Sequence, residues 1–276
     1  EFSMLEDQAY ILNEIVESAG SQQVVGIWIA GDIYDKPVPP AEAVRLFDDF
    51  LTRLAEMHLP VFIISGNHDS AERIAFGSRM LDTSGIYLSP VYDGWVEPVV
   101  LSDQYGEIAV YLLPFIKPAM VRRLWEEEPV DSYQDALRAA IAHMEISPQR
   151  RNVLLAHQFV TGAQRCESEE VSVGGLDNVD ADVFEPFDYV ALGHLHGPQW
   201  VGRETICYCG SPLKYSFSEA GQQKSALLVE LAEKGRIEIS RLPLKPVRDM
   251  REIKGPYMEL TARDSYLGTN TDDYLR

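Results

Sequence analysis

Side chains of the kind that bind divalent cations follow four short apolar segments of this sequence. Carboxylate and amide oxygens combined with imidazole nitrogens suit manganese, iron or zinc, and ligand type alone does not separate these three metals. A site that holds two such cations neutralises charge on a phosphodiester and supplies hydroxide near neutral pH. The side chains in question are Asp32, Asn67, His68, Asp69, His157, His194 and His196.

Five of these residues are predicted to be metal ligands. Asp32 has two carboxylate oxygens and is suited to bridging two cations, whereas Asn67 offers a neutral amide oxygen. His157, His194 and His196 offer imidazole nitrogens. Residues two apart in an extended segment face the same side, so the last two histidines are expected to converge on one cluster.

The two remaining polar residues are predicted to take part in catalysis. His68 directly follows the predicted ligand Asn67, so it is expected to lie beside a bound phosphate without binding metal. We predict that His68 is the general acid that protonates the leaving oxygen. Asp69 is predicted to hold the His68 imidazole in the required tautomer and to favour its protonated form.

The apolar segments that precede these residues predict buried parallel strands. The runs 24–30, 61–65, 152–156 and 189–192 are short, rich in β-branched residues and bounded by glycine or polar residues. Sites in open α/β sheets gather at the carboxyl ends of the strands, so all four runs are expected to deliver their ligands to one cleft. The glycine before each group is expected to permit a sharp strand-to-loop turn.

The rest of the sequence predicts further strands and an outer layer of helices. A Ser-x-x-Glu capping box at residues 3–6 is expected to open a helix that ends near Gly20. Strand patterns at 199–242 predict a second sheet that packs on the first. We therefore predict an α/β fold of two packed mixed β-sheets flanked by helices. Further helices are expected after Pro39-Pro40, at 71–81 and at 132–144, and a hairpin is expected within 86–115.

Two motifs resemble those of the calcineurin-like metallophosphoesterases: Gly-Asn-His-Asp at 66–69 and Gly-His-Leu-His at 193–196. The Gly-Ser-Pro block at 210–212 is similar to that of the SbcD-type nucleases within this superfamily. The resemblance covers nearly the whole chain and implies a four-layer sandwich with two divalent cations, manganese in particular. It implies a nuclease domain over 1–244 and the start of a small DNA-capping domain over 245–276.

The resemblance also implies a DNA phosphodiesterase with 3′-5′ double-strand exonuclease and single-strand endonuclease activity. An SbcC-type ATPase subunit and DNA are the implied partners, and the implied homodimer is built near 41–57 and 71–81. Two alternatives remain open at this point. One is a phosphoesterase that acts on nucleotides or other phosphoesters, and the other is a catalytically silent dimerising subunit.

One element of the family pattern is missing from this sequence. The resemblance implies a strand that ends in Asp-x-His and supplies ligands to the first metal, but none precedes Asp32. We therefore expect the first metal site to lack two ligands and the second site to bind more tightly. Nuclease activity is expected to be weak or absent unless that strand is restored.

Composition sets limits on the partners. The net charge is −19, with 24 basic and 43 acidic residues, so the chain is not expected to grip DNA alone. A basic partner or a missing segment is expected to supply the remaining attraction. The three cysteines are an odd number in a chain that needs no disulfides, which favours a reducing compartment. No apolar segment is long enough to span a membrane, and the predicted location is cytoplasmic.

Overall fold

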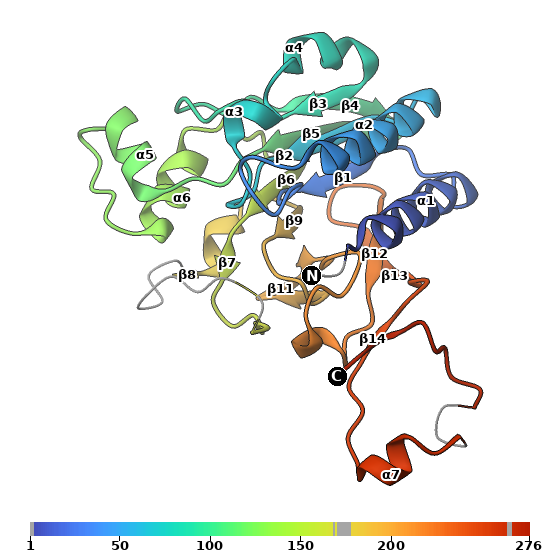
Figure 1. Cartoon of the computed structure of the whole chain (residues 1–276). Coiled ribbons are helices and arrows are strands. Elements are labelled where there is room, and N and C mark those ends of the chain that lie inside the picture. The colour runs from blue at the N-terminus through green and yellow to red at the C-terminus, as the bar shows by residue number, and fades with distance from the viewer. Residues whose placement is uncertain (1–2, 168, 170–177, 264–266) are drawn as a thin grey trace.

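Two β-sheets packed face to face form the centre of the protein, and helices cover their outer faces (Figure 1). The structure is a computed structural model and describes residues 3–167, 169, 178–263 and 267–276. It confirms the predicted α/β class of two sheets between helices. The smaller sheet, however, is parallel throughout rather than mixed.

The smaller sheet carries the first two groups of predicted site residues. It consists of β1 (Ile27–Ala30), β2 (Val61–Ile64) and β3 (Ile86–Leu88) in that order. Every residue of β2 is buried, as a continuous apolar run between two packed layers requires. Helices α1 (Leu5–Ser21) and α2 (Ala41–Glu56) lie on the outer face and share one apolar cluster with the strands.

The larger sheet carries the histidines and is mixed. Its central strands β5, β6, β9 and β11 are parallel, and the antiparallel strands β4 and β10 form the edges. Helices α5 (Pro118–Leu124) and α6 (Tyr133–Ala142) cover the outer face. The strand order is β10 (Gln199–Val201), β11 (Arg203–Tyr208), β9 (Tyr189–Gly193), β6 (Arg151–His157), β5 (Gly106–Leu112) and β4 (Val99–Asp103).

An apolar core between the two sheets holds them together. Phe62 and Ile64 of β2 pack there against Val153 and Leu155 of β6. The hairpin of β12 (Ser225–Leu231) and β13 (Ile237–Pro243) packs five partly buried side chains against the same core: Leu227, Val229, Leu231, Ile237 and Ile239. The prediction of one sheet over 199–242 is thus only partly right, because β10 and β11 join the larger sheet by pairing with β9.

Two helix predictions differ from the structure in their details. The N-cap of α1 is Met4 without a side-chain cap, so the expected capping box is absent from this end. The expected helix over 71–81 is broken into α3 (Ala71–Ile74) and α4 (Ser78–Leu81). Gly77 interrupts it with φ +77°, a left-handed conformation that ends a helix.

The C-terminal part of the chain extends away from the sheets (Figure 1). It is anchored to α1, because Arg248 pairs with Asp7 at 2.6 Å and the Tyr274 hydroxyl donates to Asp7 at 2.9 Å. The domain boundary at residue 244 stays a prediction.

Among the described residues, no helix is both long and apolar enough to cross a lipid bilayer. The remaining elements are β7 (Phe159–Val160), β8 (Asn178–Val179), β14 (Met250–Arg251), β15 (Tyr274–Leu275), α7 (Tyr257–Leu260) and short 3₁₀ helices at Asp82–Ser84, Ala181–Phe184 and Phe217–Glu219.

Candidate metal centre

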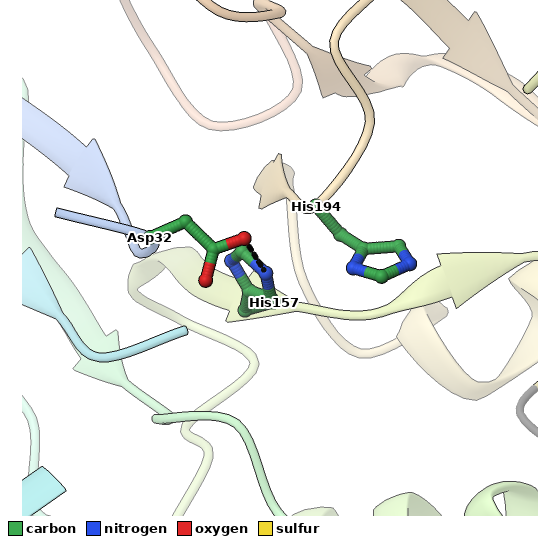
Figure 2. A group of neighbouring side chains, drawn as sticks. All are labelled: Asp32, His157 and His194. Atoms are coloured by element: carbon green, nitrogen blue, oxygen red, sulfur yellow. Dashed lines mark ion pairs between the residues drawn. The ribbon is translucent and has the colours of Figure 1, made fainter. Parts of the chain in front are cut away.

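The carboxyl ends of β1, β2, β6 and β9 meet at one place, and four predicted ligands lie there. His157 is the last residue of β6 and His194 directly follows β9. Asp32 follows β1 and Asn67 follows β2. Figure 2 shows Asp32, His157 and His194 turned toward one another from the ends of different strands. The site is therefore assembled from both sheets.

The distances within this group are those of a cation site. Asp32, His157 and His194 each offer a ligand atom, and these atoms lie within 4.8 Å of one another. Nε2 of His157 is 3.1 Å from Oδ2 of Asp32. The amide oxygen of Asn67 is 2.9 Å from Nε2 of His157 and also 2.9 Å from Nδ1 of His194. One atom from each of four residues thus faces a common point.

The tautomer of His157 follows from its other ring nitrogen. Nδ1 of His157 is 2.7 Å from the carbonyl oxygen of Ala30, and because a carbonyl only accepts, Nδ1 must carry the hydrogen. In the neutral ring the lone pair of Nε2 then points at two acceptor oxygens, those of Asp32 and Asn67. A cation satisfies all three groups at once, so these residues fit a divalent metal ion.

The charge of Asp32 is favourable for the same role. Burial opposes ionisation of this carboxyl, but with a proton on Nε2 the charge and hydrogen bond of the His157 ring, together with the backbone amide of His68, lower its pKa to about 2. A cation in the place of that proton would act in the same direction. The His68 amide donates to Oδ1 of Asp32 at 3.0 Å, which leaves Oδ2 directed at His157. Asp32 therefore enters the site as a carboxylate with one oxygen already held in place.

The backbone around the ligands is tightly constrained. Asp32 has φ 50° and His194 has φ 101°, conformations that cost non-glycine residues roughly 1–3 kcal/mol and that cluster at functional sites. A Cβ on Gly193 would lie 2.6 Å from Nδ1 of His157 and would overlap the carbonyl oxygen of Ala30. The prediction that the motif glycines serve turns is thus incomplete, because Gly193 also makes room for a ligand.

His68 and Asp69 lie beside the cluster, and their contacts differ from the predicted ones. The Asp69 carboxylate accepts the backbone amides of Ile33, Tyr34 and Gly66 at 2.9–3.1 Å, so it joins the loops that follow β1 and β2. Burial raises its pKa above the ordinary value although these amides oppose the shift. Nδ1 of His68 is instead 3.1 Å from the carbonyl oxygen of Asp35, which takes the place expected for Asp69.

His196 is placed differently from the other predicted ligands. Its ring nitrogen Nδ1 is 3.0 Å from Oε1 of Glu219, and its backbone amide donates to Glu169 at 2.6 Å. The three-residue group within 4.8 Å does not include His196. Sequence reasoning did not single out Glu169, Glu219 or the Ala30 carbonyl. Of these, only Glu219 could have been noticed in the sequence, because it ends the stretch 210–219 that begins with the Gly-Ser-Pro block.

Comparisons with known proteins identify the family of the chain. The family model for calcineurin-like phosphoesterases matches residues 5–198, so the chain belongs to that family. It is accordingly a metal-dependent phosphoesterase.

Individual relatives narrow the similarity. The chain is 35% identical to the SbcD subunit of the nuclease SbcCD from Staphylococcus saprophyticus, over 96% of this chain and 72% of that protein. It is 33% identical to the protein of the same name in Staphylococcus epidermidis, over 93% of this chain and 69% of the relative. A solved structure, TT1561 of Thermus thermophilus, covers 85% of this chain and 94% of its own, with 14% identity and a TM-score of 0.44.

Proposed function

We propose that this protein hydrolyses phosphodiester bonds of DNA with divalent cations, manganese in particular, as a 3′-5′ exonuclease and endonuclease. The observation that carries the proposal is the convergence of Asp32, Asn67 and the lone pair of His157 on one point. The names of the two staphylococcal relatives support a nuclease rather than a phosphatase of small molecules.

Each side chain has a defined task in this proposal. Asp32, Asn67, His157 and His194 hold a cation, and His196 is the further predicted ligand. Bound cations would supply charge neutralisation on the phosphate and activation of the attacking water. His68 protonates the leaving oxygen from Nε2 while its Nδ1–H donates to the Asp35 carbonyl.

The acidity of the chain favours a multi-subunit enzyme. A net charge of −19 repels the phosphates of DNA outside the metal centre, so a basic partner is needed for stable binding. The SbcCD nuclease named for the relatives provides for a second subunit, and we propose an SbcC-type ATPase in that position. We also propose that residues 245–276 begin a DNA-capping domain, with 1–244 as the catalytic domain.

The test is manganese-dependent digestion of an end-labelled linear duplex, with and without an SbcC-type partner, by this chain and by a version that carries an upstream strand ending in Asp-x-His. Digestion by the protein that is lost in His68→Ala and kept in Arg236→Ala, an exposed residue beside β13, supports the nuclease. Hydrolysis of a small phosphodiester without digestion of DNA, even with the partner, favours the general phosphoesterase. Metal binding without hydrolysis of either substrate favours the silent subunit.

We further propose that α3 and α4 form the contact with a second copy of the chain. Phe76 between the two helices is 84% exposed and Met80 of α4 is 78% exposed, and contiguous exposed apolar surface marks interaction sites. Light scattering of the protein and of Phe76→Glu tests this, with Val25→Glu as the control because Val25 is 87% exposed elsewhere. A dimer that persists in Phe76→Glu, or a monomer in the unmodified protein, contradicts the proposal.

A further inference from the structure

All polar groups of the His196 backbone, and one ring nitrogen, are held by other residues. The amide donates to Oε1 of Glu169 at 2.6 Å. The carbonyl oxygen accepts from Nζ of Lys224 at 2.8 Å and from the amide of Ser211 at 3.1 Å. Nδ1 of the ring is 3.0 Å from Oε1 of Glu219. Such complete restraint of one residue indicates that its orientation is important.

Glu219 and Lys224 form a buried ion pair beneath this histidine. Their side chains are 0% and 3% exposed, and Nζ of Lys224 is 2.7 Å from Oε2 of Glu219. Lys224 also donates to the Ser211 hydroxyl at 2.9 Å and to Gln222 at 2.8 Å. A buried pair of this kind is no reliable source of stability, because desolvation cancels most of the attraction. A role in placing His196 accounts for it better.

The protonation of the His196 ring follows from these contacts. Oε2 of Glu219 lies 2.7 Å from the buried Lys224 ammonium, and this contact is that of a carboxylate in an ion pair. Its carboxylate therefore only accepts, and the 3.0 Å contact requires a hydrogen on Nδ1 of His196. In the neutral ring Nε2 then carries the lone pair. Metal-binding histidines are commonly fixed in this way by a carboxylate on the other nitrogen.

We propose that Glu219, itself fixed by Lys224, is a positioning residue that holds His196 with Nε2 ready to bind a metal ion. This inference rests on the proposed function, in which His196 is a ligand. It also gives a physical role to the Gly-Ser-Pro block. A Cβ on Gly210 would lie 2.5 Å from the His196 carbonyl oxygen, and Ser211 donates its amide to that oxygen. The Gly-Ser-Pro block thus contacts the backbone of His196, and Glu219 contacts its ring.

The first test uses nitrogen-15 NMR of the histidine rings in metal-free protein, with His196→Gln to assign the signal. We expect the Nδ1–H tautomer of His196 in the unmodified protein. Glu219→Gln keeps an acceptor and retains this tautomer. Glu219→Met/Lys224→Met removes both charges without leaving either one unpaired and is expected to lose the preference. The Nε2–H tautomer in the unmodified protein, or an unchanged signal in the double variant, overturns the proposal.

The second test is titration with cobalt(II), followed by its absorption spectrum. The Glu219→Met/Lys224→Met variant is expected to bind the cation that contacts His196 about 10–100-fold more weakly. Adding the two methionine substitutions to His196→Gln should bring no further loss, because the pair acts through His196. Arg151→Met is the control, since it breaks the ion pair of a buried arginine with the partly exposed Asp103 at the opposite end of β6. An equal loss in the control means a general effect of folding and overturns the proposal. Both readouts are independent of DNA cleavage, so they stand or fall separately from the nuclease assay.

Discussion

The substitution Gly193→Ala tests the tight junction between the two sheets. The end of β9 lies so close to the end of β1 that the new methyl carbon would overlap the Ala30 carbonyl and lie 2.6 Å from Nδ1 of His157. Ordinary contact requires about 3.5 Å, so clearing His157 takes a shift of about 1 Å, and clearing the Ala30 carbonyl takes a larger one. The hydrogen bond from His157 to Ala30 lies at this point and is expected to break.

The size of the effect follows from these contacts. Overpacking of this kind costs about 1–3 kcal/mol and the lost hydrogen bond about 1 kcal/mol, so the free energy of unfolding should fall by about 3 kcal/mol. His157 loses the group that fixes its tautomer, which should weaken metal binding about 10–100-fold. A displacement of about 1 Å at a reacting centre lowers the rate by up to roughly 100-fold.

Urea unfolding and manganese calorimetry measure the first two quantities, and hydrolysis of bis(p-nitrophenyl) phosphate measures the third. Gly20→Ala is the control, because a Cβ there lies 3.5 Å from the end of the Met57 side chain and has room. The control should change stability by less than about 1 kcal/mol and leave metal affinity unchanged. If Gly193→Ala behaves like Gly20→Ala in both measurements, the close approach of β1 and β9 is not what holds His157.

Three further outcomes are expected. Manganese at about 100 times its dissociation constant should raise the free energy of unfolding by about 2.7 kcal/mol in calorimetry, and Asn67→Ala should lose this gain. Burial opposes ionisation of Asp7, but bonds from Arg248 and Tyr274 hold its pKa below 3.8, so its contribution exists above that pH and is lost in acid. Urea titrations should therefore show Asp7→Asn less stable than the protein at about pH 7, with the difference shrinking as the pH falls below 3.8. His68→Ala should lower hydrolysis about 10²–10⁴-fold for an alkoxide leaving group but far less for p-nitrophenolate, since the latter needs no acid; equal losses would exclude the general-acid role.

The positions of the ligands could be predicted because they depend on the local pattern of apolar residues and on the way parallel strands are arranged in a sheet. Short β-branched runs indicated the strands, and parallel strands bring their carboxyl ends to one edge. Asp32 and His157 meet for that reason, although 125 positions separate them in the sequence. The same reasoning anticipated the helices on the outer faces. It did not anticipate the break at Gly77, because the left-handed backbone of this residue depends on the tertiary structure and not on local pattern.

The contacts that surround the ligands could not be predicted. The Ala30 carbonyl carries no side-chain signal, yet it determines which nitrogen of His157 faces the site. Asp69 was expected to serve its neighbour His68, but three amides from two loops compete for its carboxylate. Glu219 lies 23 residues beyond His196 in the sequence, and the pattern of the residues between them does not predict that the two side chains meet.

The division of the site between two sheets has a consequence for the lifetime of the folded protein. Asp32 and Asn67 belong to one sheet, and His157 and His194 to the other, so a shared cation ties the layers together. Unfolding that begins with separation of the two sheets must first break the bonds between the cation and the ligands of one sheet. The ion then lengthens the survival of the native state by slowing its loss, beyond what equilibrium stability records. Digestion by a brief pulse of protease, with and without manganese, reads this lifetime directly.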